Sequence, residues 1–234
     1  MPTTLISGAN RGIGLELARQ YLADGWRVIA TCRHPDSATE LQALAQPTLE
    51  MHALDVTDHG AIDGLAGRLE HVPIDLLLNN AGIIGPVPVA EHIERQHFGN
   101  IDYELWQQVL HTNTFAPIKM AEALLPNVLA GEKKKIVTLS STVGSITERD
   151  TPAFAYATSK AAVNKAMTVL ASQLRPQGVI VALMCPGYVK TRLNFGTADV
   201  EAQDSVAGMR ALIGAFTLAD TGSFRRYNGD VIGW

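Results

Sequence analysis

The sequence predicts an α/β protein in which a mainly parallel sheet of about seven strands carries helices on both faces, giving three layers. Three observations support this fold class. Short apolar segments rich in β-branched residues alternate with amphipathic helical segments, as expected for strands joined by helical crossovers. A glycine-rich turn follows the first strand directly. The length of 234 residues and the hydrophobic content of 47% suit one buried core, so we expect a single domain over residues 1–234.

The first strand, residues 3–7, leads through Gly8-Ala9-Asn10-Arg11-Gly12-Ile13-Gly14 into an amphipathic helix. Three glycines at this spacing permit a tight turn and let backbone N–H groups approach a pyrophosphate at the start of the helix. We therefore expect the loop, including Asn10, Arg11 and Ile13, to bind the phosphates of a dinucleotide. The alternative is a turn of purely structural importance.

The second strand, residues 28–31, ends where an acidic residue would hold the ribose hydroxyls of NAD. Cys32 and Arg33 stand there instead, and Arg11 in the glycine loop is a second cation placed to reach the same ribose. Two guanidinium groups without a carboxylate suit a 2′-phosphate, which arginine binds through two parallel hydrogen bonds. The cofactor is therefore predicted to be NADP(H). The alternative is NAD, with both arginines merely solvated.

The third and fourth strands both end in polar residues. A helical stretch is expected at about residues 35–45, and the third strand then ends in Leu54-Asp55-Val56. From the local sequence, Asp55 is a candidate N-cap for a helix near residues 57–69. The fourth strand, residues 74–78, is followed by Asn79-Asn80-Ala81-Gly82, in which the asparagines are candidate turn formers.

Residues 83–101 are expected to form a long loop near the substrate entrance, where it would shape specificity. Its turn signals are Gly85-Pro86, Pro88 and Gly99-Asn100. His92 and His97 also lie there, but no further ligand cluster completes a metal site, so no metal is predicted. Helical signals resume at residue 103, and Asn113 is a polar residue on this largely apolar helix. One interpretation of Asn113 is a core asparagine whose hydrogen bonds are satisfied within the protein.

The pentapeptide Tyr156-Ala157-Thr158-Ser159-Lys160 opens another helical stretch. Positions i and i+4 of a helix lie on one face, roughly 5 to 6 Å apart at Cβ. A free tyrosine titrates near pH ~10, and a cation within hydrogen-bond range lowers its pKa by ~1 to 3 units. Tyr156 is thus expected to exchange a proton near neutral pH. A chance pairing on a surface helix is the alternative.

Upstream of this pair, an apolar strand at residues 136–139 ends in two serines. A serine at the carboxyl end of a buried strand can donate a hydrogen bond to a substrate oxygen that Tyr156 protonates. Ser140, Ser141 and the nearby Ser145 are all candidates for this hydroxyl.

The sixth strand, residues 179–184, leads to Cys185-Pro186-Gly187-Tyr188-Val189-Lys190-Thr191. The following segment, about residues 188–208, is predicted to be a substrate lid carrying Leu193, Asn194 and Phe195. A last strand is expected within the tail from residue 222 onward.

These motifs, in this order and over nearly the whole chain, resemble those of the short-chain dehydrogenase/reductase family. The resemblance implies a Rossmann-type doubly wound sheet with strand order 3-2-1-4-5-6-7. It also implies a catalytic set of Asn113, Ser141, Tyr156 and Lys160, with Ser141 chosen as the second serine of Leu-Ser-Ser. Lys160 would lower the pKa of Tyr156 and bind the nicotinamide ribose, and Asn113 would hold a water that links Lys160 to solvent.

The resemblance also assigns the cofactor contacts. Asp55 would bind the adenine amine, the Asn-Asn-Ala-Gly and Pro-Gly turns would border the nicotinamide, and Thr191 would bind its carboxamide or the diphosphate. The full set expected is Gly8, Asn10, Arg11, Gly12, Ile13, Gly14, Arg33, Asp55, Val56, Asn80, Ala81, Gly82, Tyr156, Lys160, Pro186, Gly187, Val189 and Thr191. The stretch from Gly82 to Asn113 departs from the family pattern because it is longer than usual.

Within the family the chain most resembles small NADPH-dependent carbonyl reductases, in a branch with sniffer-like and C-factor-like proteins. The long segment after Gly82 and the tail at residues 221–229 carry this similarity. It implies reduction of an aldehyde or ketone of a small molecule, with Tyr156 as proton donor. Two alternatives stay open: an NADP-binding sensor or signalling protein without significant turnover, and an NAD-dependent alcohol dehydrogenase.

Composition and charge limit the classes of binding partner that we expect. The chain has 19 basic and 23 acidic residues, a net charge of −4 and no basic stripe beyond residues 133–135, so nucleic-acid binding is not expected. It shows neither a secretory signal nor an apolar stretch of the ~18 to 20 residues that a membrane helix needs, which predicts a cytoplasmic protein. Amphipathic helices around residues 103–128 and 156–175 leave a homo-oligomer possible.

Overall fold

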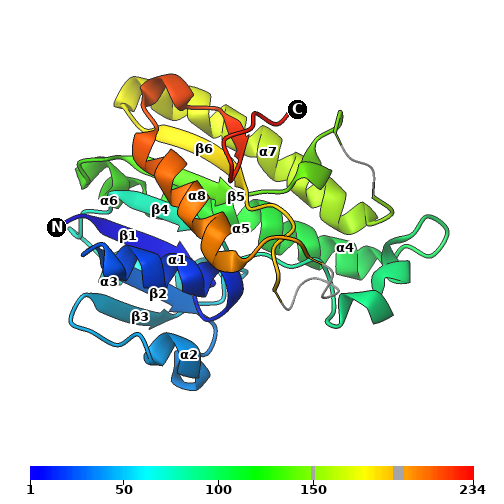
Figure 1. Ribbon diagram of the computed structural model, residues 1–234, viewed down its shortest axis with the longest axis horizontal. Helices are drawn as coiled ribbons and strands as arrows, with labels where there is room; N and C mark the ends of the chain where they lie inside the picture. The colour runs from blue at the N-terminus through cyan, green and yellow to red at the C-terminus, as the bar shows by residue number, and fades with distance from the viewer. Residues whose placement is uncertain (149–150, 192–197) are drawn as a thin grey trace.

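The computed structural model describes residues 1–148, 151–191 and 198–234. Within these ranges, seven parallel strands form one sheet in the order β3-β2-β1-β4-β5-β6-β7 (Figure 1). The strands are β1 (Thr3–Ser7), β2 (Arg27–Cys32), β3 (Leu49–Ala53), β4 (Leu76–Asn79), β5 (Lys135–Leu139), β6 (Ile180–Cys185) and β7 (Phe224–Arg226). The predicted fold class, strand number and strand order are confirmed.

Helices cover the sheet on both faces. They are α1 (Gly12–Ala23), α2 (Thr39–Gln42), α3 (His59–Arg68), α4 (Tyr103–Leu110), α5 (Ala116–Ala123), α6 (Leu125–Ala130), α7 (Phe154–Leu174) and α8 (Ala202–Ala215). Helices α1 and α8 lie together in front of the sheet in Figure 1, and their buried residues share one apolar cluster. Helices α3, α5 and α7 contribute to the cluster on the opposite face.

Strand β1 shows how the two clusters are separated. Leu5 belongs to the cluster that includes α3, α5 and α7, whereas Ile6 belongs to the one that includes α1 and α8, and both side chains are fully buried. Successive side chains of a strand point to opposite faces of the sheet. Because both faces are covered, the central strands β1, β4 and β5 are buried along their whole length, as in other fully enclosed parallel sheets.

Several boundaries differ from the sequence-based expectation. The helical stretch expected at residues 35–45 is only a 3-10 turn (Pro35–Ser37) followed by α2, because Ala38 between them leaves helical dihedral angles. Strand β4 begins at Leu76 rather than at residue 74. Asp75 instead accepts a hydrogen bond from the backbone N–H of Thr3 at 2.8 Å. Strand β6 runs one residue further than expected, to Cys185.

Strand β3 ends at Ala53, so Asp55 lies in the loop beyond it. The N-cap of α3 is Asp58, whose Oδ1 accepts from the backbone N–H of Ala61 at 2.9 Å. The N-cap alternative for Asp55 is therefore wrong. Asp55 accepts instead from the backbone N–H and the hydroxyl of Thr57, at 2.9 and 2.7 Å, which turns the chain at the carboxyl end of the strand.

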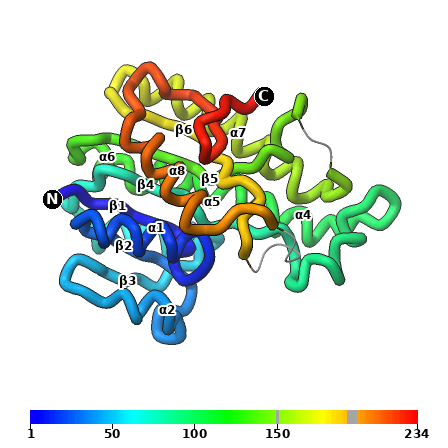
Figure 2. Tube along the Cα trace, viewed as in Figure 1, coloured from blue at the N-terminus to red at the C-terminus, as the bar shows by residue number. Residues whose placement is uncertain are grey.

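Residues 83–102, which we call the insertion, project beside α4 at the right of Figure 2. The expected loop contains two short 3-10 helices, Val89–Glu91 and Ile93–Gln96. Its base is closed by an ion pair between Arg95 and Asp102. Asp102 also caps α4, because its Oδ1 accepts from the backbone N–H of Leu105 at 2.9 Å.

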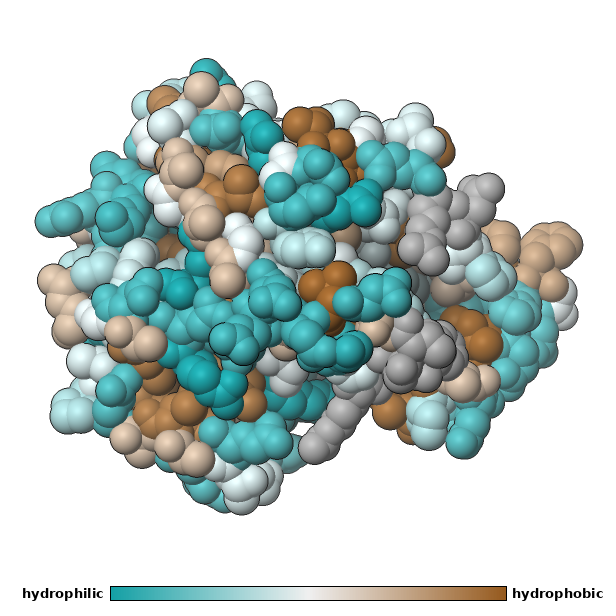
Figure 3. All heavy atoms as spheres, in the orientation of Figure 1, coloured by the Kyte–Doolittle hydropathy of each residue, from teal (hydrophilic) through white to brown (hydrophobic). Residues whose placement is uncertain are grey.

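The solvent-facing side of the helical layer is mostly polar. Hydrophilic residues cover most of the face over α1 and α8 (Figure 3). Cys32 and Cys185 are buried and free. In the described parts of the chain, no helix combines the length and the apolar character that a bilayer crossing requires.

Candidate active site

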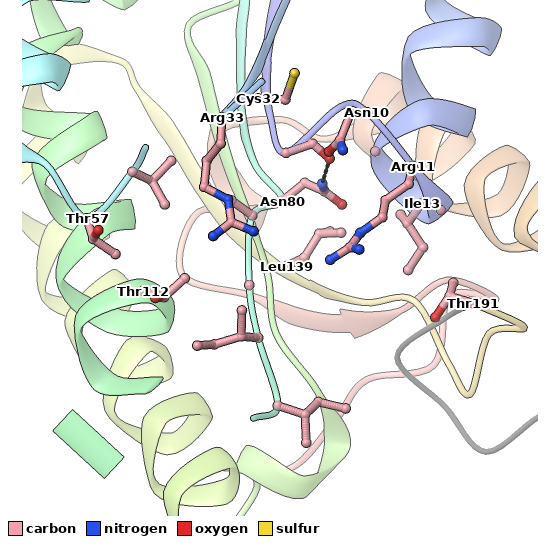
Figure 4. A pocket seen from close by; sticks show the side chains of 18 of the residues that line it. Asn10, Arg11, Ile13, Cys32, Arg33, Thr57, Asn80, Thr112, Leu139 and Thr191 are labelled. Carbon is pink, nitrogen blue, oxygen red and sulfur yellow. Dashed lines mark hydrogen bonds between the residues drawn. The ribbon is translucent and has the colours of Figure 1, made fainter. Parts of the chain in front are cut away.

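A cavity of about 660 Å³ lies at the carboxyl edge of the sheet, where the loops after β1, β2, β4, β5 and β6 meet (Figure 4). Carboxyl ends of parallel strands share one edge, which is where ligands bind in open α/β sheets. The sequence-predicted residues that line it are Gly8, Asn10, Arg11, Gly12, Ile13, Gly14, Arg33, Asp55, Val56, Asn80, Ala81, Gly82, Tyr156, Lys160, Pro186 and Thr191. Asn113, Ser141, Gly187 and Val189 do not line it.

The glycine loop is built as the sequence predicts. Gly8 and Gly12 have φ values of +68° and +55°, in the left-handed region where a side chain adds strain. A Cβ on Gly14 would lie 2.3 Å from the carbonyl oxygen of Gly8. The side-chain amide of Asn80 donates to the carbonyls of Ser7 and Gly8, at 2.8 and 3.0 Å. The loop after β4 thus fastens the glycine loop at the cavity wall.

Two arginines, Arg11 and Arg33, and two acidic residues, Glu40 and Asp55, line the end of the cavity near β2 and β3. The side chains of Arg11 and Arg33 both extend into the cavity in Figure 4. Burial alone would raise the pKa of Asp55, but hydrogen bonds from Thr57 hold it below its usual value, with the charges of Arg33 and His111 contributing. This end therefore presents two guanidinium groups and an ionised carboxylate, which fit the phosphates and the adenine amine of a dinucleotide.

Some lining residues lie outside the sequence-based prediction. Gln108, His111 and Thr112 line the cavity from the region where α4 continues into a π-helical segment, His111–Phe115. The ring of His111 stacks on that of His59, with 5.2 Å between centroids. The three lining residues follow the i, i+3, i+4 spacing of one helix face. That spacing is the signal in the sequence, but only the packing of α4 shows which face meets the cavity.

Tyr156 and Lys160 lie on one face of α7, as predicted. The ammonium nitrogen of Lys160 lies 5.8 Å from the centroid of the Tyr156 ring and donates to the carbonyl oxygen of Leu139 at 2.9 Å. Burial lowers the pKa of Lys160 to about 8, because the charged form loses water that protein groups only partly replace.

The pKa of Tyr156 corrects the sequence-based expectation. Burial raises it to about 12, and a hydrogen bond with the side chain of Ser141 offsets part of that rise. The expected lowering by Lys160 does not occur in this structure, because both groups are enclosed and the cost of removing the phenolate from water dominates. Tyr156 is therefore a protonated phenol at neutral pH.

The three candidate serines have different partners. The Ser140 hydroxyl donates to Oδ1 of Asn164 at 2.5 Å and is buried, although Ser140 lines the cavity. Ser145 bonds within its own turn, to Thr147. The Ser141 hydroxyl accepts from the backbone N–H of Val143 at 3.4 Å, and it lies close enough to Tyr156 to lower the pKa of the phenol. The geometry therefore favours Ser141 as the hydroxyl that accompanies the phenol.

Asn113 is almost fully buried in the π-helical segment and connects two walls of the site. Its amide nitrogen donates to the carbonyl oxygen of Ile83 at 2.8 Å and to the hydroxyl of Ser159 at 3.0 Å. Its Oδ1 accepts from the backbone N–H of Ile83 at 2.9 Å. Asn113 thus joins the loop after β4 to α7, between Tyr156 and Lys160.

The segment after β6 packs against the C-terminal tail. Gly187 has a φ of +83°, and a Cβ there would lie 2.9 Å from the Tyr227 ring. A bridge joins Val189 to Val200, and an ion pair joins Lys190 to Glu201. Residues 189–190 and 200–201 of the predicted lid are thus held together.

The predicted lid itself is only partly described. Leu193, Asn194 and Phe195 lie outside the described residues. Residues 202–208, the end of the predicted lid, form the first turns of α8. That boundary was wrong because Val206 and Met209 pack into the core, and a core-packed helix cannot serve as a cover.

No group of three or more His, Cys, Asp or Glu side chains in the described ranges is arranged to hold a metal ion. His92 lies between the two 3-10 helices of the insertion, and His97 follows the second.

Comparisons with known proteins agree with this geometry. The structure is similar to the carbonyl reductase Sniffer of D. melanogaster, with a TM-score of 0.90, 29% identity and full coverage of both chains. It is also similar to the NADPH-bound carbonyl reductase from chicken fatty liver, with a TM-score of 0.91 and 32% identity, covering 100% of this chain and 94% of that one.

Sequence comparison agrees with the structural comparison. The chain is 32% identical to the C-signal of Myxococcus xanthus over 163 residues, which are 69% of this chain and 93% of that protein. The model of the short chain dehydrogenase family matches residues 2–201, a range that contains the glycine loop, the Asn-Asn-Ala-Gly turn, the Tyr156 and Lys160 pair and the segment after β6. The chain therefore belongs to the short-chain dehydrogenase family.

Proposed function

We propose that this protein is an NADPH-dependent reductase of the carbonyl group of a small aldehyde or ketone. The observation that carries the proposal is the contact of Tyr156 with Ser141 on one side and Lys160 on the other, at the wall of a cavity with the features of a dinucleotide site. Family membership establishes an oxidoreductase fold, and this arrangement supports a proton donor beside a hydride source.

NADP(H) is the cofactor that the cavity fits. The glycine loop would hold the diphosphate, and Arg11 with Arg33 would hold the 2′-phosphate. The solved carbonyl reductase from chicken fatty liver is described as NADPH-bound, which agrees with the prediction from the sequence. Bound in this way, NADPH would supply a hydride for the carbonyl carbon.

The protein groups supply the proton and orient the substrate. We infer that the Ser141 hydroxyl donates a hydrogen bond to the carbonyl oxygen, while the Tyr156 phenol transfers its proton to that oxygen as negative charge develops. A pKa of about 12 keeps Tyr156 protonated before the reaction. Because the pKa of Tyr156 shows no lowering by Lys160, the role proposed for Lys160 is to bind the nicotinamide ribose, as the family resemblance implies. Asn113, by resemblance, would hold a water that returns a proton through Lys160.

Apolar side chains suggest the kind of substrate. Ile83, Ile84 and Leu139 line the cavity, which favours a largely apolar small molecule over a charged one. Val87, in the insertion, is 52% exposed and lies outside the lining.

A fluorescence titration with NADPH and NADH tests the cofactor assignment. We expect NADPH to bind more tightly, and Arg33→Ala to weaken NADPH binding about tenfold or more while leaving NADH binding nearly unchanged, because a hydrogen bond to a charged group contributes about 1.5–3 kcal/mol. Oxidation of NADPH against a panel of aldehydes, ketones and quinones then tests turnover. A preference for NADH would contradict the assignment and favour the alcohol dehydrogenase alternative.

The sensor alternative keeps one specific support, the similarity to the C-signal. It makes a different prediction for the same experiment: tight NADPH binding with no turnover of any carbonyl in the panel. The grouping of Ser141, Tyr156 and Lys160 at one place argues for catalysis instead.

Three further expectations stay predictions. We propose that residues 1–234 act as a single domain, that the protein is cytoplasmic and that a homo-oligomer would form through α4 and α7. Gel filtration with light scattering measures the last of these.

A further inference from the structure

The insertion places one buried amide against the helix of the proton donor. Gln96 ends the second 3-10 helix of the insertion and is 2% exposed. Its Oε1 accepts a hydrogen bond from the backbone N–H of Tyr156 at 3.0 Å. Its Nε2 donates to the backbone carbonyl of Ile84 at 2.8 Å. Both polar ends of this side chain thus bond the backbone of residues that line the cavity.

The N–H of Tyr156 needs a partner from outside the helix. Helix α7 begins at Phe154, so Tyr156 is its third residue, and the first N–H groups of a helix have no acceptor within it. The side chain of the N-cap residue normally accepts from the second or third of these groups. Here the N-cap is Ala153, which provides no side-chain hydrogen bond. Gln96 takes over the capping function from a position 60 residues away in sequence.

The other end of Gln96 holds the opposite wall of the cavity. Ile84 follows Ile83, which Asn113 already binds through both backbone groups. The space around the amide is closed, since a Cβ on Gly85 would lie 3.1 Å from Nε2 of Gln96. The loop after β4 and the first turn of α7 are therefore held at a separation set by one side chain.

We propose that Gln96 is a positioning residue for the reaction, because it fixes the backbone of Tyr156 relative to the wall formed by residues 83–85. This inference rests on the proposed reductase function. It also gives the insertion a role in that function: the segment that lengthens the chain before α4 carries the cap of the helix that bears the proton donor. A shift of this helix by ~1 Å would lower turnover by up to about 10²-fold, with no loss of a reacting group.

The chemistry of the amide suggests two variants. Gln96→Met has a similar length but neither accepts nor donates a strong hydrogen bond. Gln96→Glu reproduces the amide only when protonated, because a carboxylic acid has one carbonyl acceptor and one O–H donor. Its carboxylate form would still accept from Tyr156 but would face the Ile84 carbonyl oxygen without a proton between them.

The experiment is steady-state kinetics with NADPH and the best carbonyl from the panel, between pH 5.5 and 9. For Gln96→Met we expect kcat to fall about tenfold or more, with the Kd for NADPH within about twofold of wild type, since the glycine loop is untouched. For Gln96→Glu we expect kcat near wild type at low pH and a decline as pH rises through the ionisation of the new carboxyl. The wild-type protein should not show this decline of kcat.

A matched control is available two residues beyond Tyr156. The hydroxyl of Thr158 accepts from Nε1 of Trp106 at 2.8 Å and donates to the carbonyl oxygen of Phe154 at 2.6 Å. Thr158→Val removes these bonds, which hold the same part of α7, without touching the Tyr156 amide. We expect its kcat to stay within about twofold of wild type. Thermal unfolding of all variants separates lost stability from lost positioning. Hydrogen exchange at the Tyr156 amide should speed up in Gln96→Met and not in Thr158→Val.

The outcomes distinguish the two claims. A wild-type kcat in Gln96→Met, with lowered thermal stability alone, would overturn the positioning role and leave the reductase function standing. An equal fall of kcat in Thr158→Val would also overturn it, since any loosening of α7 would then suffice. A wild-type protein that binds NADPH but reduces no carbonyl would refute the proposed function and the role of Gln96 in it.

Discussion

The two halves of the cavity are built in different ways. At the cofactor half, the shape of the glycine loop follows from backbone angles that glycine permits, and the turn at Asp55 is formed by residues two positions apart, while Asn80 adds one long-range contact. At the proton-donor half, Tyr156 is held by Ser141 and by Gln96, which lie 15 and 60 positions away (156 − 141 and 156 − 96). The comparison suggests that cofactor binding tolerates changes at the proton-donor half, whereas the geometry of proton transfer depends on long-range packing.

The largest expected effect separates the two halves. Tyr156→Phe removes the proton donor but keeps the ring, so turnover should fall by about 10²–10⁴-fold. The Kd for NADPH should change little, because the glycine loop and both arginines remain. Single-turnover kinetics with a titration of NADPH would measure both quantities. Turnover close to that of wild type would remove Tyr156 from the mechanism.

A smaller effect is expected in the pH dependence of stability. Burial lowers the pKa of Lys160 to about 8 in the folded state, against 10.5 for the ordinary group. Between these values the unfolded chain binds more protons than the folded one, so stability should rise with pH. Relative to Lys160→Met, wild type should gain up to about 3 kcal/mol over this window.

Urea unfolding at pH 7.5 and pH 10 measures this gain. The control is Lys165→Met, an exposed lysine of the same helix, for which the pH dependence should match wild type. The measurement is limited to pH 10 and below, because above pH 10 the raised pKa of Tyr156 makes the free energy of unfolding fall as pH rises. In that range the folded state keeps a proton that the unfolded state has lost. Parallel curves for wild type and Lys160→Met would show that Lys160 is not desolvated.

The smallest expected effect on stability lies in the cofactor half. A Cβ on Gly14 would meet the Gly8 carbonyl oxygen at 2.3 Å, so Gly14→Ala should cost about 1–3 kcal/mol of unfolding free energy and weaken NADPH binding. Gly67 in α3 has no heavy atom within 4 Å of its Cβ position, and Gly67→Ala should be neutral or stabilising by up to about 1 kcal/mol. Denaturation curves for the two variants test the contrast. Equal stabilities would show that the glycine loop can relax.

Much of the fold could be predicted from the sequence because its signals are local. The parallel sheet follows from apolar runs such as residues 76–78 between helical segments, and the dinucleotide loop follows from three glycines in seven residues. The errors also have local causes. Asp55 and Asp58 are both plausible caps before one helix, and only the observed start of α3 at His59 distinguishes them. The sequence alone suggests that residues 202–208 belong to a lid, and only their contacts with the core show that they do not.

The sequence by itself determined the alternation of strands and helices, the phosphate loop, the two arginines and the pairing of Tyr156 with Lys160, because each depends on residues close in the chain, and the family resemblance added the strand order. Only the tertiary structure decided that Ser141 contacts Tyr156, that burial rather than Lys160 dominates the phenol pKa, and that Gln96 caps α7. These features depend on which distant surfaces pack together and on how completely they exclude water. No local spacing in the sequence encodes either quantity.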